Sequence, residues 1–280
     1  MKPSFIFTVA ISIVLQISTV HASSMNELGA RLGSPNYAER LAAVREIAIE
    51  YPQEGLKLLL QAAADPDEFV RERAVQALGL ADSGQAVGAL KKALKDPDAF
   101  VRWRAVQSLA RLGVHDIAQE LGSLIADPSW HVKVSALELL GTIGAEQLKR
   151  KGPEIKGNLD EPVRQPLLRG LADSDERVKV AAASALARNR DDAAFGPLVE
   201  LVRDGSMYVR DQAALALGDL GDIRAVEPLI GLIADPRNGY SEEGTDWARW
   251  GAAKALQKLT GEDYRIDAQK WRDWLSSHNK

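Results

Sequence analysis

The chain contains no cysteine and only four histidines among its 280 residues. The first absence excludes disulfides, a thiol nucleophile and cysteine-bound metal, and it argues against a lipid-anchored lipoprotein. With 35 basic and 39 acidic residues, the sequence also lacks a strong excess of either charge. It therefore presents no global field for nucleic acid, and we expect no nucleic-acid partner.

Motifs of common catalytic sites are also missing. The sequence has no Gly-x-Ser-x-Gly nucleophile elbow, no phosphate-binding loop and no His-Glu-x-x-His zinc motif. His115, His131 and His278 stand in different settings, and none lies within metal-ligand spacing of another. We therefore expect no enzymatic activity, no cofactor and no metal.

A long apolar run occurs only at the N-terminus. Residues 5–20 are mostly apolar, they follow Met1-Lys2, and the segment ends in Val20-His21-Ala22. This pattern is typical of a secretory signal peptide over 1–22, which predicts an exported protein, periplasmic or extracellular. A retained membrane anchor is the alternative, but the run is short against the ~20 residues that span a bilayer. Membrane contact is expected only if this segment is retained.

A dipeptide recurs at a fixed interval along the rest of the chain. Asp65-Pro66, Asp96-Pro97 and Asp127-Pro128 stand 31 residues apart, and the interval returns between Asp173, Asp204 and Asp235. Such a period indicates stacked structural repeats.

Each repeat predicts two helices, A before the aspartate turn and B after it. In the helix B expected over 99–109, the apolar residues Val101, Ala105, Val106 and Leu109 form one core-facing stripe. Glycines then end some of these helices, as a left-handed C-cap requires, at Gly113, Gly144 and Gly221. Helices B should begin near Pro35, Pro66, Pro97, Pro128, Ser174, Gly205 and Asp246.

The proline-containing helix A, the Asp turn, and the Val-Arg and Ala-x-x-Leu steps of helix B resemble HEAT repeats. They are most similar to the short type of phycobilisome lyase-like proteins. The resemblance covers Met25 to about Leu259. It implies an all-α solenoid of about seven helix pairs, forming a single domain over 23–280, with helices B on a concave binding face.

Two insertions and a tail depart from the interval. The first lies at 145–161 and contains Lys149-Arg150-Lys151, which predicts either a solvated linker or a basic contact for a partner. The second lies at 237–247. Residues 260–280 should form a C-terminal cap, with Asp267 as the N-cap of a helix that turns Trp271 and Trp274 inward.

Basic residues recur at one register of the helices B, in Arg40, Arg71, Arg102, Lys133, Lys179, Arg210 and, by alignment, Arg249. They could form a stripe for an acidic partner. The favoured interpretation pairs them with the turn aspartates of the same or an adjacent repeat.

The candidate partner-binding residues stand on helix B outside its buried stripe. Aromatic side chains in such positions would act as anchors for a partner, although they could also merely pack on the neighbouring repeat. The candidates are Trp103, Trp250, Phe100, His131, Tyr208, Glu72, Gln76, Gln107 and Asp211.

The sequence therefore predicts an exported, non-catalytic scaffold that binds a protein partner, with Trp103→Ala weakening binding. Two alternatives come with the resemblance. One is a small-ligand or tetrapyrrole-handling protein of the phycobilin lyase-like class. The other is an enzyme like deoxyhypusine hydroxylase, which is disfavoured because that site rests on His-Glu pairs and no histidine here is followed by glutamate.

Overall fold

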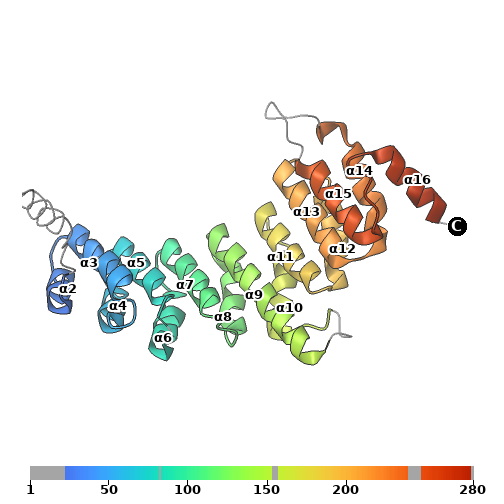
Figure 1. Ribbon diagram of the computed structural model, residues 1–280. Helices are drawn as coiled ribbons and strands as arrows, with labels where there is room; N and C mark the ends of the chain where they lie inside the picture. Colours follow the sequence, from blue (N-terminus) through green and yellow to red (C-terminus); the bar gives the residue numbers. More distant parts are fainter. Residues whose placement is uncertain (1–22, 82, 153–156, 239–246, 279–280) are drawn as a thin grey trace, which may run out of the picture. The chain divides into compact units, whose positions relative to one another are not determined.

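The computed structural model describes residues 23–81, 83–152, 157–238 and 247–278, and over these residues the chain forms helices and turns without a strand. The fold is that of an all-α solenoid, built from pairs of antiparallel helices and closed by a final helix (Figure 1). The predicted signal peptide, 1–22, lies outside the described residues.

The chain divides into two compact units, residues 1–89 and 90–280, and each is described by itself. The first contains α2 (Met25–Leu32), α3 (Tyr37–Glu50), α4 (Leu56–Ala62) and α5 (Glu68–Leu78), and α6 (Gly84–Ala93) spans the boundary. The second contains α7 (Ala99–Arg111), α8 (Ala118–Ser123), α9 (Trp130–Lys151), α10 (Glu161–Gly170), α11 (Glu176–Arg188), α12 (Phe195–Leu201), α13 (Met207–Leu220), α14 (Val226–Ala234), α15 (Trp247–Thr260) and α16 (Ala268–His278).

The odd-numbered helices α3 to α15 are the predicted helices B, and each begins within two residues of its predicted start. Asp67 and Asp98 act as N-caps, because each carboxylate accepts backbone N–H groups two and three residues ahead. The predicted stripe of α7 is buried, with Val101 and Ala105 fully enclosed. The local signals of the sequence therefore placed these helices and their core faces well.

Basic residues of helix B clamp one repeat to the next. In the first unit, Arg40 Nη1 donates to the carbonyls of Ser34 and Pro35 at 2.9 and 3.2 Å. Its Nε and Nη2 donate to the two carboxylate oxygens of Asp65 at 2.8 and 2.9 Å. Asp65 also accepts the Asp67 N–H at 2.9 Å. One guanidinium thus closes its own turn and holds the next one.

The same clamp recurs in the second unit. Arg102 binds both carboxylate oxygens of Asp127 at 2.7 and 2.9 Å, and Lys133 reaches Asp173 at 2.7 Å. The hydrogen bonds to Asp127 raise the pKa of Arg102 further. The ion-pair interpretation of the basic rank is confirmed at these positions, whereas Lys179 differs by pairing with Glu176 in its own helix.

Successive helices B of the second unit lie side by side, and small residues set their separation. A Cβ atom added to Gly141 of α9 would stand 2.8 Å from Ala185 Cβ of α11, and one added to Gly218 of α13 would stand 2.9 Å from Ala255 Cα of α15. Such close approach leaves no room for a larger side chain at either glycine.

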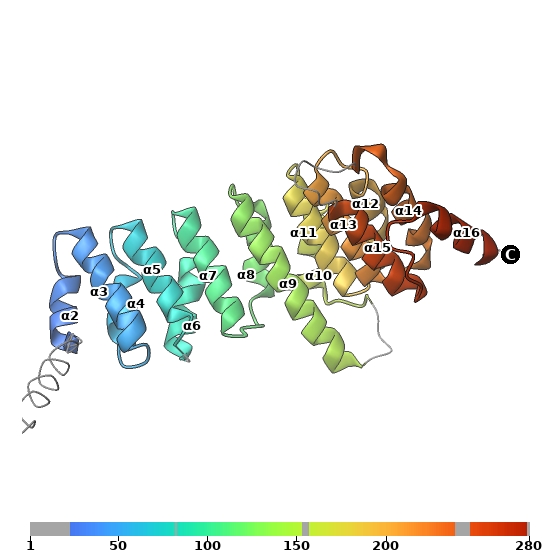
Figure 2. The ribbon, with the colours of Figure 1, turned by 45° about the horizontal axis from the view of Figure 1, so that its top comes forward.

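Residues 145–151 of the first insertion are helical, and the expectation that Gly144 ends helix B is wrong. Helix α9 continues to Lys151, where Gly152 with φ of 112° ends it (Figure 2). Gly144 serves close packing instead, because a Cβ there would stand 2.7 Å from Leu159 Cδ2 and 3.2 Å from Asn189 Nδ2. Within the basic run, Lys151 pairs with Asp160 at 2.7 Å.

The residues of the predicted C-terminal cap include a final helix, α16. Asp267 accepts the N–H groups of Gln269 and Lys270 at 3.1 Å and so begins α16 as its N-cap. Trp271 is fully buried, and its indole N–H donates to the Arg265 carbonyl at 2.9 Å. Helix α16 packs on α14, in the position that a further helix A would take (Figure 1). Most of the second insertion, 239–246, lies outside the described residues.

Candidate functional site

The second unit presents a row of side chains at one register of its helices B, directly before the first buried residue of each helix. Phe100, Tyr208 and Trp247 in this row are 58%, 60% and 60% exposed. His131 and Arg177 fill the two remaining places on α9 and α11. The row therefore places a large planar side chain at the start of every helix B of this unit, and all of them except the half-buried His131 are exposed to solvent.

Phe100, His131 and Arg177 of this row join Trp103 and Trp130 in one cluster across α7, α9 and α11, called here the aromatic cluster. The ring centroids of Phe100, Trp103 and His131 lie 6.1 to 6.4 Å apart. The His131 ring stacks on Trp130 at 3.6 Å, and the Arg177 guanidinium carbon lies 3.7 Å from the Trp130 ring centroid. Ring stacking and cation–π contact together hold the cluster as a pre-formed surface.

Trp103 belongs both to this surface and to the seam between α7 and α9. It is half-buried, its indole N–H donates to Ser135 Oγ at 3.0 Å, and the Arg104 guanidinium lies 4.5 Å from its ring centroid. The alternative that the aromatic residues pack on the neighbouring repeat therefore applies in part to Trp103. Its replacement by alanine would disturb helix packing as well as the exposed face.

A pocket of about 280 Å³ adjoins the cluster on the same face and is called here the helix-B pocket. Its lining combines apolar and aromatic side chains with polar and charged ones. The residues that line it come from three successive helices B: Trp130, Val134, Glu138, Arg177, Val180, Ala181, Ser184, Arg188, Tyr208 and Gln212.

The charges around the helix-B pocket differ in how far they are compensated. The guanidinium of Arg177 binds both carboxylate oxygens of Asp175 at 2.9 and 2.6 Å, and this hydrogen bonding lowers the pKa of Asp175. Across the described segments, the structure places no ion-pair partner within 4 Å of Arg188 or of Glu138. The pocket thus carries one fixed, neutralised cation and two charges available to a ligand.

Asp211 and Trp250 lie farther along the unit. Burial raises the pKa of Asp211, whose Oδ2 accepts a hydrogen bond from Gln212 Nε2 at 3.0 Å. Its other oxygen lies against Gly251 of α15, at a place where any Cβ would collide with it. Asp211 is therefore part of the α13–α15 seam. Trp250 of α15 is 43% exposed.

The three remaining candidates lie on α5 and α7. Gln107 is exposed on α7 and accepts a hydrogen bond from Arg104 at 3.0 Å. Glu72 and Gln76 lie on α5 of the first unit, both half-buried, and Gln76 accepts from Arg73 at 2.6 Å. The structure thus brings Phe100, Trp103 and His131 together with the helix-B pocket and Tyr208, and leaves the other candidates outside that group.

Several residues of this site were not predicted. Arg177 stands four residues after Asp173, as Phe100 stands after Asp96, so its position was readable, but arginine does not look like an aromatic anchor. Trp247 follows Tyr208 by the same 39-residue step that joins Gln212 to Gly251. Glu138, Ser184 and Arg188 carried no signal, because only the packing of three helices makes them neighbours.

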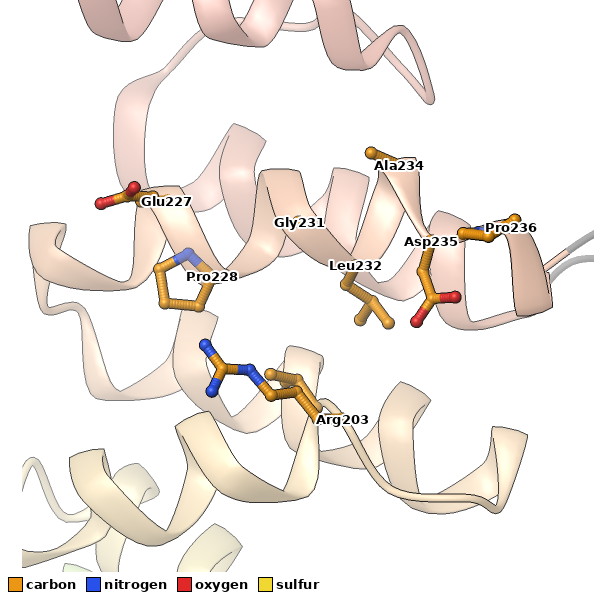
Figure 3. Close-up of a pocket in the computed structure, with 9 residues that line it drawn as sticks. Arg203, Glu227, Pro228, Gly231, Leu232, Ala234, Asp235 and Pro236 are labelled. Atoms are coloured by element: carbon orange, nitrogen blue, oxygen red, sulfur yellow. The ribbon is translucent and has the colours of Figure 1, made fainter.

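A second, larger cleft of about 740 Å³ lies on the helix-A side of the same unit, between the end of α12 and α14. Figure 3 shows Arg203 directed toward Pro228 at one end, and Asp235 with Pro236 at the other. None of the predicted site residues lines this cleft.

Two further properties bear on function. In the part of the chain that the structure describes, no three His, Cys, Asp or Glu side chains gather as a metal site would require. No helix among the described residues combines the length and apolar character needed to cross a membrane.

The model of the family described as HEAT repeats matches residues 25–110, 87–151 and 164–244, which is most of the chain. The chain belongs to the HEAT-repeat family. No curated protein sequence matches this HEAT-repeat protein.

Solved structures resemble the HEAT-repeat protein in fold. The archaeal HEAT-like repeats protein from Thermococcus onnurineus is 18% identical, with a TM-score of 0.52 over 85% of this chain and 98% of that one. The complex of CpcE and CpcF of phycocyanin lyase from Nostoc sp. is 24% identical, with a TM-score of 0.47 over 90% of this chain and 95% of that one. Human deoxyhypusine hydroxylase is 18% identical, with a TM-score of 0.40 over 91% of this chain and 96% of that one. At these identities the likeness concerns the fold alone.

Proposed function

We propose that this HEAT-repeat protein is an exported, non-catalytic scaffold that binds a protein partner through the helix-B face of its second unit. The partner would contact the aromatic cluster and place a side chain in the helix-B pocket. This assigns the partner-binding role to Phe100, Trp103, His131 and Tyr208, with Trp250 and the polar candidates outside the centre of the contact.

The observation that carries this proposal is the contiguity of the aromatic cluster with a pocket that combines apolar and polar lining residues. Aromatic side chains dominate the binding energy of protein interfaces, and anchors cluster where a neighbouring pocket excludes water. The rings of Phe100, Trp103 and His131 are already in contact with one another before any partner binds. A pre-formed surface of this kind loses little side-chain entropy on association.

The volume of the helix-B pocket favours a partner's side chain over a tetrapyrrole. At about 280 Å³ it lies at the lower limit of sites that bury drug-sized ligands, about 300 Å³. The small-ligand alternative has a roomier place in the cleft beside α14, at about 740 Å³. An absorbance spectrum of the purified protein above 300 nm tests that alternative directly, since a bound tetrapyrrole would be coloured.

Export would place a new charge beside an acidic side chain of the first unit. The backbone nitrogen of Ser23 lies 2.8 Å from Glu46 Oε1, and Arg31 pairs with Glu46 Oε2 at 2.6 Å. Cleavage after Ala22 would make this nitrogen the α-ammonium of the mature chain, so that it would form an ion pair with Glu46. N-terminal sequencing of the protein recovered from the periplasm or medium tests the cleavage.

The partner is sought with the exported protein as bait in extract of its own compartment, beside two single variants. Tyr208→Ala removes an exposed ring from the pocket wall and should reduce capture at least tenfold, the loss typical of an interface anchor, at least about 1.4 kcal/mol. Ile223→Ala is the matched control, because Ile223 is 57% exposed but lies in the 3-10 turn that precedes α14, outside the helix-B pocket. Equal capture by wild type and Tyr208→Ala would reject the proposed face.

A further inference from the structure

The geometry of the helix-B pocket points to the chemistry of its occupant. We propose that it binds a peptide segment whose apolar side chain enters the pocket and whose neighbouring acidic residue pairs with Arg188. This inference rests on the proposed function and adds to it the class of partner sequence that the site selects.

An apolar side chain suits the floor and walls of the pocket. Val180 and Ala181 of α11 form part of its floor and are buried beneath it, and Val134 of α9 adjoins them. Tyr208 rises on the α13 side and Trp130 on the α9 side. Burying an aliphatic or aromatic side chain between these groups releases water from apolar surface on both partners.

Arg177 acts as a fixed part of the wall. Its guanidinium is stacked over Trp130 at 3.7 Å and held by both carboxylate oxygens of Asp175. The ion pair with Asp175 already neutralises the charge of Arg177. We therefore expect the guanidinium to offer a ligand a flat surface for stacking, and not a free positive charge. The discrimination by charge must then come from elsewhere in the pocket.

Arg188 supplies that discrimination. It lies at the last position of α11, is exposed, and has no acidic partner within 4 Å among the described residues. Its Nη2 is 3.4 Å from the Cβ position of Gly141, which places the guanidinium over α9 at the end of the pocket. A carboxylate arriving here can accept two parallel N–H bonds, the geometry for which arginine is best suited.

Polar groups along the pocket complement the backbone of such a segment. Ser184 and Gln212 line it between Arg188 and Tyr208 and can donate to or accept from peptide groups. Glu138 lies on α9, three residues before the Gly141 position that Arg188 approaches, and can accept backbone N–H groups of the segment.

This preference opposes the charge of the protein as a whole, which is −4. Non-specific electrostatic attraction would favour basic segments. If the pocket selects acidic peptides, the net charge of the protein cannot be the cause, and the selection must come from groups in the pocket.

The test uses a phage-displayed library of random twelve-residue peptides, selected on the exported protein. Bound peptides are sorted by their loss of binding to Tyr208→Ala, which marks those that occupy the pocket. These peptides should share an apolar residue with Asp or Glu nearby. Arg188→Glu should weaken them about tenfold or more, since reversal replaces an attraction with a repulsion, and selection on this variant should enrich Lys or Arg instead.

Two controls separate the possible results. Arg188→Gln should weaken the same peptides less than Arg188→Glu does. Arg203→Glu reverses an exposed arginine in the cleft beside α14 and should change their binding less than twofold. Peptides that depend on Tyr208 but show no acidic residue, or no response at Arg188, would overturn this inference and leave the proposed face intact. A library without any Tyr208-dependent peptide would count against both.

Discussion

A single methyl group at Gly218 tests how closely the helices B are stacked. Gly218 of α13 faces Ala255 of α15, and a Cβ there would stand 2.9 Å from Ala255 Cα and 3.0 Å from its Cβ. Carbon atoms pack at about 3.5 to 4.0 Å. Because the collision involves backbone, no change of rotamer can relieve it, and Gly218→Ala must push the two helices apart.

The magnitude follows from two opposing effects. Overpacking of this kind costs about 1–3 kcal/mol, and alanine in place of glycine within a helix recovers about 1 kcal/mol. Gly218→Ala should therefore lower the free energy of unfolding by up to about 2 kcal/mol. Gly231 of α14 is the matched control, because no atom lies within 4 Å of its Cβ position. Gly231→Ala should raise the free energy of unfolding by about 0.5–1 kcal/mol.

Urea unfolding followed by far-ultraviolet circular dichroism measures both variants, and amide hydrogen exchange locates the change. Stacked repeats can open in segments, so Gly218→Ala should speed exchange mainly in α13 and α15. The reasoning would be refuted if Gly218→Ala proved as stable as Gly231→Ala, because the close approach of α13 and α15 would then not exist.

Other expected outcomes test the clamps and the cap. Arg102→Ala should destabilise the protein by about 2–3 kcal/mol in urea titrations, because it leaves the buried Asp127 carboxylate without its partner; a loss below about 0.5 kcal/mol, as at surface sites, would contradict this. Hydrogen bonds from Ser23 and the ion pair with Arg31 lower the pKa of Glu46 to about 2. The stabilisation from Glu46 is therefore complete above its unfolded pKa of about 4.3 and disappears as the pH falls toward 2. The stability gap between wild type and Glu46→Gln should close on acidification; a gap that widens would be inconsistent. Trp271→Ala should cost about 3–5 kcal/mol and expose α16 to proteolysis, whereas an unchanged cleavage pattern would show that the cap does not depend on this side chain.

Local signals in the sequence determined the helices B and their core. The recurring turn aspartates mark where each helix B begins, and the apolar spacing of Val101, Ala105 and Leu109 marks the buried face, so both could be inferred from the sequence alone. The extension of α9 was also readable, because residues 145–151 contain only good helix formers. The prediction for Gly144 was wrong because glycine occurs both at helix ends and where helices pack closely. The sequence does not distinguish these two roles.

The site was less predictable because it is made by contacts between repeats. The repeat spacing predicted that Phe100, His131 and Tyr208 share one face of the helices B. It did not predict the hydrogen bond from Trp103 to Ser135, which holds Trp103 in the seam between α7 and α9. Nor did it indicate that Asp211 lies against Gly251. Such contacts depend on how far one helix is shifted along the next, which side-chain packing decides.

Site-specific photo-crosslinking tests the central claim, partner binding by the helix-B face, most directly. Tyr208 and, separately, Ile223 are replaced by p-benzoyl-phenylalanine, and the exported protein is irradiated within its own compartment. Both positions are similarly exposed, at 60% and 57%, but only Tyr208 belongs to the helix-B pocket. The account predicts one discrete protein adduct from position 208 and none of that mass from position 223. The same adduct from both positions, or from 223 alone, would contradict it.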